Sequence, residues 1–371
     1  MVTVLQFISS LSDGGAETLV KDYGILFNRY SELNIRCIIV TLHCVKDSAN
    51  YNRLKDSGVE VITIYRHHNP FVSLHRRFLG IKYVSRKIYQ IIKSYDPVAI
   101  HVHLGLLKYL QPISKKLQNI KLFYTCHNEP SIMFGHNDGE KEAASYLIDN
   151  NNLRLIALHD EMRRQLDEMF GTDHTIVVNN GVDIARFSNV VESKEEIRKS
   201  LNIPDQSFVI GHIGRFSDQK NHAFIIRIFA RLLELHDDTY LILIGTGPLK
   251  HQILQSARAA GIHDRIIFLS RRTDIPQLLK CMDVFLFPSL FEGLSVTLIE
   301  AQAAGLRCVI SDRIKPYNVL SETTVQISLD YSVDKWCEAV LDRSVKNDFY
   351  HDIMEFDIRR SVESLSVIYN Q

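Results

Sequence analysis

Residues 284 to 301 carry the pattern that decides the fold of this chain. They read Val284-Phe285-Leu286-Phe287-Pro288-Ser289-Leu290-Phe291-Glu292-Gly293-Leu294-Ser295-Val296-Thr297-Leu298-Ile299-Glu300-Ala301. A short apolar run typical of a buried strand is followed by a loop that ends at a glycine, and then by a run with helical character. Glu292 and Glu300 are eight positions apart, so on a helix they would lie about 80° apart around the axis and about 12 Å apart along it. One nucleotide-sized ligand could therefore touch both carboxylates.

The start of this helix is a second candidate binding element. Gly293 relaxes the steric limits on the backbone, and the next residues open the helix with N–H groups that have no partner inside it. Such groups favour an anion, so a phosphate is expected there with a carboxylate on either side. The segment predicts a ligand that combines phosphate with polyol hydroxyls. An ordinary loop-to-helix junction with an apolar face is the alternative.

The alternation of strand and helix continues through most of the chain. Short apolar runs rich in β-branched residues occur in two series, at 2–8, 35–41, 59–65, 98–102, 121–126, 153–158 and 175–178, and then at 208–213, 240–244, 265–269, 284–287, 307–310 and 325–327. Strands that alternate with helices predict a parallel sheet covered on both faces, and two series predict two doubly wound domains. A length of 371 residues also favours two domains.

The domain boundary is expected after the turn-rich stretch Asn179-Asn180-Gly181-Val182-Asp183. Ser193 and Glu196 form a capping-box pattern that begins a short helix, so the linker is placed near 181–206. From Ser332 to the end the pattern turns helical. We assign residues 1–185 to the first domain and 186–352 to the second.

Composition indicates an ordinary globular protein. Hydrophobic residues make up 46% and charged residues 23%, and 43 basic residues balance 43 acidic ones, which excludes disorder or a fibrous repeat. Six cysteines are scattered at 37, 44, 126, 281, 308 and 337, without close pairs or metal-ligand spacing, as expected of reduced structural thiols. The sequence contains no apolar run of bilayer length and no leader pattern, so a cytoplasmic location is expected.

One stretch is strongly basic. Between Arg66 and Lys121 the chain carries eleven Lys or Arg against a single acid, Asp96. The apolar residues that interleave with these charges are Val72, Leu74, Phe78, Leu79, Tyr83 and Val84. An amphipathic helix at a membrane surface and a solvated helix face with an apolar core side both fit this pattern.

Four further motifs follow predicted strands, where ligands bind in open α/β sheets. They are Gly14-Gly15, Gly214-Arg215 with Lys220, Gly245 with Gly247, and Arg271-Arg272. Glycines let a backbone approach a ligand closely, and an arginine and a lysine five positions apart can bind two phosphates. The alternatives are turns that use glycine for steric reasons alone and basic loops that are merely solvated. Lys250 stands where the full G-x-G-x-x-G fingerprint needs glycine, which disfavours an NAD enzyme.

Three histidines follow two neighbouring strands of the first series. Strand alternation places His101 and His103 on one face, and His127 follows the next strand. A metal site would need Glu129 as its carboxylate partner. A polar histidine in a ligand cleft fits the pattern better.

Taken together, these motifs resemble the retaining GT-B glycosyltransferases of family 4, over nearly the whole chain and in the same order. The segments that carry the resemblance are Gly14-Gly15-Ala16-Glu17, Asn180-Gly181-Val182-Asp183 with Phe187, Gly214-Arg215-Phe216 with Gln219-Lys220-Asn221, Gly245-Thr246-Gly247-Pro248-Leu249, and Phe291-Glu292-Gly293 with Glu300-Ala301. Residues 300–312 are most similar to bacterial capsular, exopolysaccharide and O-antigen transferases. The resemblance implies an α/β protein of two Rossmann-like domains that face each other across a cleft. It also implies a C-terminal helix, at about 353–371, that packs back on the first domain.

The resemblance implies a set of site residues. Those implied in catalysis are Glu292, His127, Arg215 and Lys220. Those implied in donor binding are Gly14, Gly15, Gly214, Arg215, Lys220, Gly245, Gly247, Arg271, Arg272, Glu292, Gly293, Leu294, Ser295, Val296, Thr297 and Glu300. Those implied on the acceptor side are His103, His127 and Asn128.

Within this set, Arg215 and Lys220 would bind the diphosphate, Glu292 the sugar hydroxyls and Glu300 the ribose. The backbone N–H groups of 294–297 would bind phosphate, and the two adjacent arginines would lie where the base is held. Cations at the diphosphate would stabilise the charge that develops as the bond to the sugar breaks. Glu292 is then a positioning residue rather than a nucleophile.

The implied reaction transfers a hexosyl or N-acetylhexosaminyl unit from a nucleotide diphosphate sugar, preferably UDP-linked, to a glycan or polyprenyl-pyrophosphate-linked acceptor in surface polysaccharide or lipopolysaccharide synthesis. No cofactor or metal and no nucleic acid is implied, and residues 66–121 would contact anionic membrane at its cytoplasmic face. A nucleotide-sugar 2-epimerase of the same fold and a catalytically silent GT-B partner subunit are the alternatives. Silence is disfavoured because the cationic and acidic site residues are all present.

Overall fold

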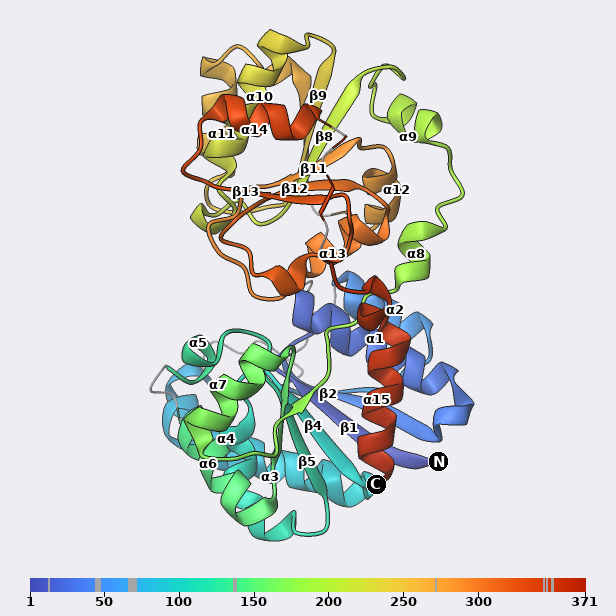
Figure 1. The fold of residues 1–371 in the computed structure, drawn as a ribbon. Coiled ribbons are helices and arrows are strands. Elements are labelled where there is room, and N and C mark those ends of the chain that lie inside the picture. Colours follow the sequence, from blue (N-terminus) through green and yellow to red (C-terminus); the bar gives the residue numbers. More distant parts are fainter. Residues whose placement is uncertain are drawn as a thin grey trace. The chain divides into compact units, whose positions relative to one another are not determined.

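The computed structural model describes residues 1–371 except 13, 44–47, 66–71, 136–138, 271, 343, 345 and 348–349, and it describes the side chains of the helix at 72–95 from Gly80 onward. The chain forms two compact units, the first made of residues 1–181 with 358–371 and the second of residues 182–357. The chain therefore passes between units inside the Gly181-Val182 turn, a few residues before the predicted boundary at 185 (Figure 1).

Each apolar run predicted to be a strand forms one, so the alternation of strand and helix is confirmed. The strands of the first unit are β1 (Val2–Ile8), β2 (Ile35–His43), β3 (Val61–Tyr65), β4 (Ala99–His103), β5 (Lys121–Thr125), β6 (Arg154–Ala157) and β7 (Ile176–Val177). Those of the second unit are β8 (Phe208–Ile213), β9 (Thr239–Ile244), β10 (Ile266–Leu269), β11 (Val284–Phe287), β12 (Arg307–Ser311) and β13 (Thr324–Ile327).

Both sheets are parallel and doubly wound. The first has the order β3-β2-β1-β4-β5-β6-β7 and the second the order β10-β9-β8-β11-β12-β13. In each sheet the order reverses beside the first strand, between β1 and β4 and between β8 and β11. Loops that leave the carboxyl ends of these strands diverge, which makes this switch point the expected ligand site of each unit.

Helices connect the strands. Those of the first unit are α1 (Gly15–Arg29), α2 (Ala49–Asp56), α3 (Val72–Tyr95), α4 (Leu107–Leu110), α5 (Pro130–Phe134), α6 (Glu140–Asn151), α7 (Asp160–Phe170) and α15 (Ile358–Asn370). Those of the second unit are α8 (Ile184–Ser188), α9 (Lys194–Ser200), α10 (His222–Leu235), α11 (Lys250–Ala259), α12 (Ile275–Lys280), α13 (Val296–Ala303) and α14 (Val333–Leu341). Among the described helices, none combines the length and apolar character that crossing a bilayer requires.

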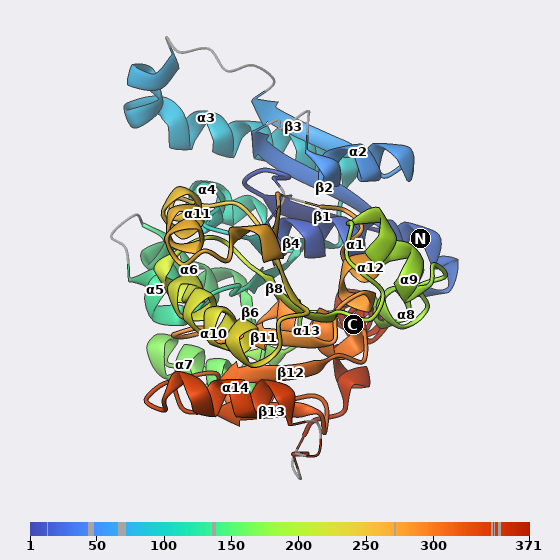
Figure 2. The same cartoon turned by 90° about the horizontal axis from the view of Figure 1, so that it is seen from above.

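The apolar faces of the helices bury both sides of each sheet. In the second unit α10 and α14 lie on one side, where Phe229 and Trp336 share a buried cluster with Leu241, and α12 and α13 lie on the other, where Ile299 packs with Phe285 (Figures 1 and 2). In the first unit α1 and α15 pack on one side of the sheet, and α3, α4 and α6 lie on the opposite side (Figure 1). Burial on both faces explains why the strands read as nearly continuous apolar runs.

The C-terminal helix α15 is part of the first unit. The ring of Tyr369 packs against Phe27 and Phe123, at centroid distances of 5.8 and 5.4 Å. Gly181 is needed at the crossing because a Cβ there would lie 2.3 Å from the Cα atom of Ile358. The glycine in the predicted boundary turn therefore makes room for the returning helix.

The helical pattern predicted from Ser332 to the end forms two helices, α14 and α15, with non-helical residues between them. Asp342 accepts a hydrogen bond from the backbone N–H of Ser344 (2.9 Å), and Asp352 accepts one from that of Met354 (2.9 Å). These local bonds compete with helix. Residues 353–356 form a separate 3-10 turn, and α15 begins only at Ile358.

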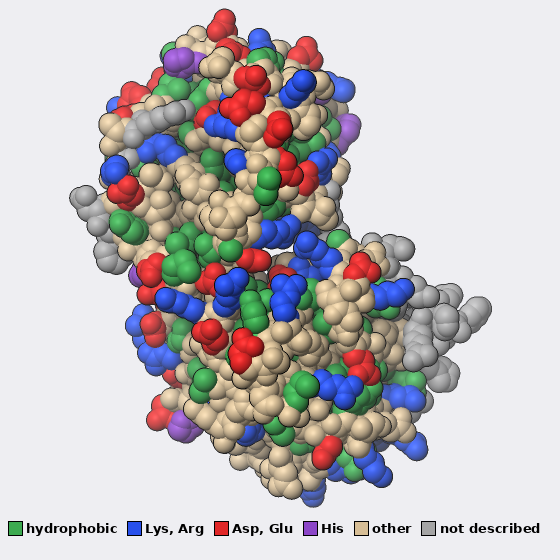
Figure 3. Space-filling view, turned by 90° about the vertical axis from the view of Figure 1, so that its right-hand side faces the viewer, with side chains coloured by type: hydrophobic (Ala, Val, Ile, Leu, Met, Phe, Trp, Pro, Cys, Tyr) green, Lys and Arg blue, Asp and Glu red, His purple; other side chains and the backbone are tan. Residues whose placement is uncertain are grey.

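The surface and the thiols agree with the composition. On the face shown in Figure 3, basic and acidic side chains are interspersed over both units. The described cysteines are all buried with free thiols, at Cys37, Cys126, Cys281, Cys308 and Cys337. Burial raises the pKa of the Cys37 thiol to about 12, so the group stays protonated. Cys44 lies outside the described residues.

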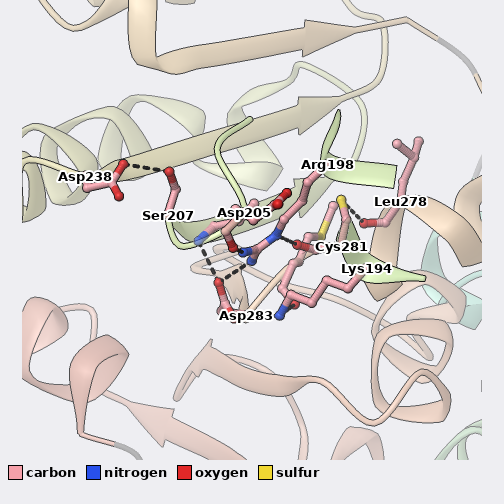
Figure 4. A network of polar contacts seen from close by, with 10 residues as sticks. Lys194, Arg198, Asp205, Ser207, Asp238, Leu278, Cys281 and Asp283 are labelled. Atoms are coloured by element: carbon pink, nitrogen blue, oxygen red, sulfur yellow. Dashed lines mark hydrogen bonds and ion pairs between the residues drawn. The ribbon is translucent and has the colours of Figure 1, made fainter. Parts of the chain in front are cut away.

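Asp283 fastens the short helix α9 to the second sheet (Figure 4). Its carboxylate accepts hydrogen bonds from Lys194 Nζ and Arg198 Nη2, each at 2.7 Å, and from the backbone N–H of Val209 at 2.8 Å. Arg198 also donates to the carbonyl of Cys281 at 3.0 Å. The predicted capping box of Ser193 and Glu196, which begins this helix, is confirmed.

Replacing Asp283 with asparagine is expected to lower the free energy of unfolding by about 3 kcal/mol, because Arg198 would be left as a buried, uncompensated charge. Burial alone would raise the pKa of Asp283, but the bonds from Lys194 and Val209 and the two nearby cations outweigh it and lower the pKa. A lowered pKa gives stability that is present above the ordinary aspartate pKa of about 3.9 and is lost as the pH falls through the folded value.

The test is urea unfolding of both forms from pH 7 downward. The difference between them should shrink only in the acid range. Asp330→Asn, at a residue whose side chain is 82% exposed in its pair with Arg313, should change stability by less than about 0.5 kcal/mol. An equal loss for both variants would contradict the account.

Candidate functional site

Two loops of the second unit, which leave β8 and β11, are bonded to each other. The carbonyl of Gln219 accepts from the backbone N–H of Leu290 (2.8 Å), and its amide donates to the carbonyl of Phe291 (3.0 Å). Asn221 Nδ2 donates to the carbonyl of Pro288 (3.1 Å). These bonds join the predicted Arg-Lys motif to the stretch around Glu292 at the switch point of the sheet.

Lys220 and Glu292 form an ion pair at the junction of these loops. Lys220 Nζ lies 2.6 Å from Oε1 of Glu292, with side-chain exposures of 14% and 7%. The ammonium also lies 4.6 Å from the centre of the Phe287 ring, a cation–π distance. The sequence predicts each residue as a ligand-binding group but does not predict that they bind each other.

Arg215 differs from Lys220 in its surroundings. Its side chain is exposed, and no described residue forms an ion pair with it. The positive charge of Lys220 is already balanced by the carboxylate of Glu292. The charge of Arg215 is not balanced by a described residue and is available to an incoming anion. Of the two cations predicted to act together, one is therefore ion-paired before a ligand binds and the other is not.

The start of α13 only partly matches the predicted phosphate site. The backbone N–H of Ser295 donates to Oδ1 of Asn318 at 2.9 Å, so it is not open to a ligand. Ser295 is the N-cap, and its hydroxyl accepts from the N–H of Leu298. The N–H groups of Leu294, Val296 and Thr297 have no acceptor among the described residues. Glu300 is half-buried on this helix.

Asn318 is a site residue that the sequence analysis missed. It is fully buried, and besides accepting from Ser295 it donates to the carbonyl of Gly293 at 3.0 Å. Gln302 in turn donates to the carbonyl of Asn318 at 2.9 Å. The loop between Glu292 and the helix is thus held by a residue 23 positions away. A lone asparagine in a loop gives no pattern from which this could be predicted.

Asn318→Ala is expected to lower kcat/KM about 10- to 100-fold, because loosening a positioning loop misplaces the groups on it. It also leaves the N–H of Ser295 and the carbonyl of Gly293 without partners, which costs about 1–3 kcal/mol for each buried group. Steady-state kinetics and thermal unfolding measure the two effects. Asn189→Ala, at an exposed position of the same unit, should leave both unchanged, and an Asn318→Ala enzyme with normal kinetics would contradict the role.

Gly245 and Gly247 serve the packing of backbone against backbone. A Cβ on Gly245, which has φ +150°, would lie 2.0 Å from the carbonyl oxygen of Gly214, and one on Gly247 would lie 2.4 Å from that of Phe216. The N–H of Phe216 donates to the carbonyl of Thr246 at 3.0 Å. The glycines therefore let the loop after β9 support the loop that carries Arg215.

The predicted base-binding arginines are placed only in part. Arg271 lies outside the described residues. Arg272 forms a two-pronged ion pair with Asp274, at 2.7 and 2.5 Å. Its guanidinium is thus engaged on the exposed surface.

In the first unit, the Gly14-Gly15 turn begins α1 as predicted, with Gly14 as the N-cap. The carboxylate of Glu17 folds over Gly14: a Cβ there would lie 2.3 Å from Glu17 Oε2. Ser12 Oγ donates to Glu17 Oε1 at 2.7 Å. Gly15 is exposed, and a Cβ there would meet no atom within 4 Å.

The histidines lie at the switch point of the first sheet. His101 and His103 share one face, as predicted, with ring centroids 4.2 Å apart. Both are fully buried, so His103, predicted on the acceptor side, has no side-chain surface open to solvent. Its ring nitrogens bond Gln6 Oε1 (2.6 Å) and His127 Nε2 (2.8 Å). His127 is half-buried and Asn128 is exposed.

These histidines are neutral. Burial lowers the pKa of His101 to about 3 and that of His127 to about 4, and it lowers the pKa of His103 well below its usual range. Within the part of the chain that the structure describes, no group of three or more His, Cys, Asp or Glu side chains could hold a metal ion.

The basic stretch is described only in part. Arg66 to Phe71, and the side chains of Val72, Leu74, Phe78 and Leu79, lie outside what the structure describes. Along the rest of α3, Tyr83 is 46% exposed, whereas Val84 is buried in the core. Val84 therefore cannot contribute to a membrane-facing surface.

Comparison with solved structures identifies the fold class. The chain superposes over its whole length on HepE of Anabaena, crystallised in complex with UDP and glucose, with a TM-score of 0.76 and 18% identity, and covers all of that chain. The fold is GT-B, with two Rossmann-like units that each contain a parallel sheet.

Sequence comparison identifies the family. The family described as "Glycosyltransferase Family 4" matches residues 14–186, and the family described as "Glycosyl transferases group 1" matches residues 193–328. EpsF of Bacillus subtilis, whose name assigns it to the glycosyltransferases, is 26% identical over 99% of this chain and 96% of its own length. The UDP-Gal:alpha-D-GlcNAc-diphosphoundecaprenol alpha-1,3-galactosyltransferase of Escherichia coli is 32% identical over 43% of this chain and 42% of its own. The chain belongs to the group 1 glycosyltransferases and is a glycosyltransferase enzyme.

Proposed function

We propose that this chain is a retaining glycosyltransferase of bacterial surface polysaccharide or lipopolysaccharide synthesis. It transfers a hexosyl or N-acetylhexosaminyl unit from a UDP sugar to a glycan or lipid-linked oligosaccharide acceptor. The observation that carries the proposal is the Lys220–Glu292 pair at the junction of the β8 and β11 loops. Arg215 precedes Lys220 on the first of these loops, and α13 begins just after the second. The junction combines cations for a diphosphate with a carboxylate for hydroxyls.

The chemistry of this junction suits departure of a diphosphate. When the bond from the anomeric carbon to phosphate breaks, negative charge grows on the diphosphate, and fixed cations then stabilise the transition state more than the ground state. Arg215 supplies an open, forked donor, and Lys220 a point charge. We propose that these two cations and the free N–H groups of α13 serve without a metal ion.

Retention follows in this proposal from reaction on one face of the sugar. The departing phosphate oxygen takes the proton of the acceptor hydroxyl, so no carboxylate nucleophile is needed. Glu292 holds sugar hydroxyls, and its bond to Lys220 is consistent with a charged positioning group. Glu300, on helix α13, binds the ribose.

The names of two similar proteins support the choice of ligands. The Escherichia coli relative is named for a UDP-galactose donor and a diphosphoundecaprenol-linked acceptor, and HepE was crystallised with UDP and glucose. A lipid-linked acceptor would bring the enzyme to the cytoplasmic face of the membrane, where we propose that the basic stretch 66–121 contacts anionic headgroups.

The two alternative functions are not favoured. The matched families and the relatives named above are glycosyltransferases, which gives no support to a 2-epimerase. A silent partner subunit would not need a largely shielded lysine paired with a carboxylate, nor, on the same loop, an arginine that has no ion partner among the described residues.

The test is a panel of UDP, GDP and dTDP sugars, first by thermal shift and then by transfer to a polyprenyl-diphosphate-linked sugar. A ligand that binds only the folded state raises the melting temperature, and at a fixed ligand concentration the shift grows with the logarithm of its affinity. UDP sugars should give the largest shift, and the product should keep the anomeric configuration of the donor. Donor epimerised without any acceptor would instead identify an epimerase.

A further inference from the structure

A chain of buried hydrogen bonds in the first unit ends at His127. Nε2 of Gln6 donates to the hydroxyl of Tyr369 (3.1 Å), and Oε1 of Gln6 lies 2.6 Å from Nε2 of His103. Nδ1 of His103 lies 2.8 Å from Nε2 of His127. Gln6, His103 and Tyr369 are fully buried, so water does not compete for these bonds.

The direction of these bonds fixes where the ring protons lie. The amide oxygen of Gln6 can only accept, so Nε2 of His103 carries the proton. A neutral imidazole has a single N–H, which leaves Nδ1 of His103 as an acceptor for the N–H at Nε2 of His127. Nδ1 of His127 is then left with a lone pair.

Burial keeps these histidine rings neutral, so each ring carries a single N–H. It lowers the pKa of His103 well below its usual range and that of His127 to about 4. The neighbouring ring of His101 is bonded to the hydroxyls of Tyr369 (2.5 Å) and Thr125 (2.7 Å). None of the rings of His101, His103 and His127 therefore carries a second proton near neutral pH.

Nδ1 of His127 is the last atom of this series of hydrogen bonds. The atom is buried and has no hydrogen-bond partner among the described residues. It follows β5 at the carboxyl edge of the sheet, the edge at which ligands of such sheets bind. A neutral nitrogen with a lone pair in that place accepts a hydrogen bond from a hydroxyl and has no proton of its own to donate.

We propose that Gln6 and His103 are positioning residues that hold His127 in the tautomer with an unprotonated Nδ1, so that it accepts a hydrogen bond from a sugar hydroxyl. The inference rests on the proposed function for its ligand, but not for its proton arrangement. Because Gln6 also bonds Tyr369, helix α15 secures the amide orientation on which the tautomer depends.

The first test reads the tautomer directly in the full-length enzyme. Long-range ¹H–¹⁵N spectra of histidine-labelled protein distinguish protonated from unprotonated ring nitrogens, and His127→Asn assigns the signal. Unprotonated Nδ1 in the wild type is expected. Protonated Nδ1 would mean that the Gln6 amide points the other way, and would overturn the proposal whether or not transfer is observed.

The second test changes the chain. Gln6→Met removes the acceptor and should convert the His127 signal to a mixture of tautomers and lower kcat about 10- to 100-fold, while affinity for UDP, which lacks the sugar, stays unchanged. Gln6→Glu keeps an oxygen that accepts from His103 and should keep the wild-type tautomer. Gln118→Met, on the exposed surface of the same unit, is the matched control. An unchanged His127 tautomer in folded Gln6→Met would overturn the proposal, and the wild-type spectrum decides it if that variant does not fold.

Adding donor and acceptor separately shows which of them supplies the hydroxyl. If a ligand shifts the ¹⁵N signal of His127 Nδ1 and UDP alone does not, that ligand supplies the hydroxyl that bonds this nitrogen. If no nucleotide sugar supports transfer, the proposed function fails while the tautomer assignment still stands or falls on the spectrum.

Discussion

Lys220→Ala is expected to lower kcat/KM for glycosyl transfer by about 100- to 1,000-fold, the usual effect of losing one preorganised charge donor at a developing negative charge. The loss should lie mainly in kcat, because the diphosphate gains charge as it departs. The variant should also be less stable without ligand, since Glu292, whose side chain is only 7% exposed, would lose its ion partner. Steady-state kinetics and urea unfolding measure the two effects separately.

Two comparisons make this prediction specific. Lys335→Ala removes a lysine that is also paired, with Glu338 at 2.6 Å, but whose side chain is 59% exposed, so it should change neither quantity appreciably. Arg215→Ala should lower activity without lowering stability, because Arg215 has no ion partner among the described residues. A Lys220→Ala enzyme with wild-type kcat would remove Lys220 from the reaction.

Glu292→Ala is expected to lower kcat/KM about 100-fold or more, because each charged hydrogen bond is worth about 1.5–3 kcal/mol and Glu292 also orients Lys220. Glu292→Gln should keep measurable activity, since an amide still bonds sugar hydroxyls and Lys220 is left free to bind the diphosphate. A nucleophilic carboxylate would behave differently: the amide would be inactive. The kinetics of the two variants therefore separate a hydroxyl-binding role from a nucleophile.

Mass spectrometry of the wild-type enzyme during turnover gives the matching structural test. No covalent adduct of sugar on Glu292 should form, because the reaction is proposed to occur on one face without a protein nucleophile. A glycosylated Glu292 peptide, or full recovery of Glu292→Ala by added formate or azide with inverted product, would instead assign the carboxylate as the nucleophile.

The fold could be predicted from the sequence because its signals are local. Short β-branched runs, their alternation with amphipathic stretches and the Ser193–Glu196 capping box each depend on neighbouring residues, and all are present in the structure. The break within the helical pattern at 332–371 is harder to place, because periodicity does not distinguish aspartates that bond their own following backbone, such as Asp342, from helical aspartates.

The site was less predictable because its decisive contacts are distant in sequence. Lys220 and Glu292 are 72 positions apart, and Gln6 and Tyr369 are 363 apart. Helical and strand periods carry no information at such separations. Asn318 acts through a backbone N–H, so nothing in the motif around Ser295 indicates that the group is already occupied.

Glycine motifs were ambiguous for a physical reason. A glycine that allows close approach of a ligand and one that allows close approach of another backbone have the same sequence signature. Gly245 and Gly247 make room for the loop of Gly214 and Phe216. They shape the site through packing, in addition to any contact with the nucleotide.

The central claim is that the loops after β8 and β11 bind the diphosphate of the donor. Calorimetric titration with the nucleoside diphosphate of the donor selected in the panel tests it most directly, on the wild type, the double variant Arg215→Ala/Lys220→Ala and the exposed control Arg313→Ala/Lys335→Ala. Because two charge-assisted bonds are lost, the first double variant should bind at least about 100-fold more weakly than the wild type. The control double variant should bind as tightly as the wild type. Binding by Arg215→Ala/Lys220→Ala within about threefold of the wild type, about 0.6 kcal/mol, would contradict the claim.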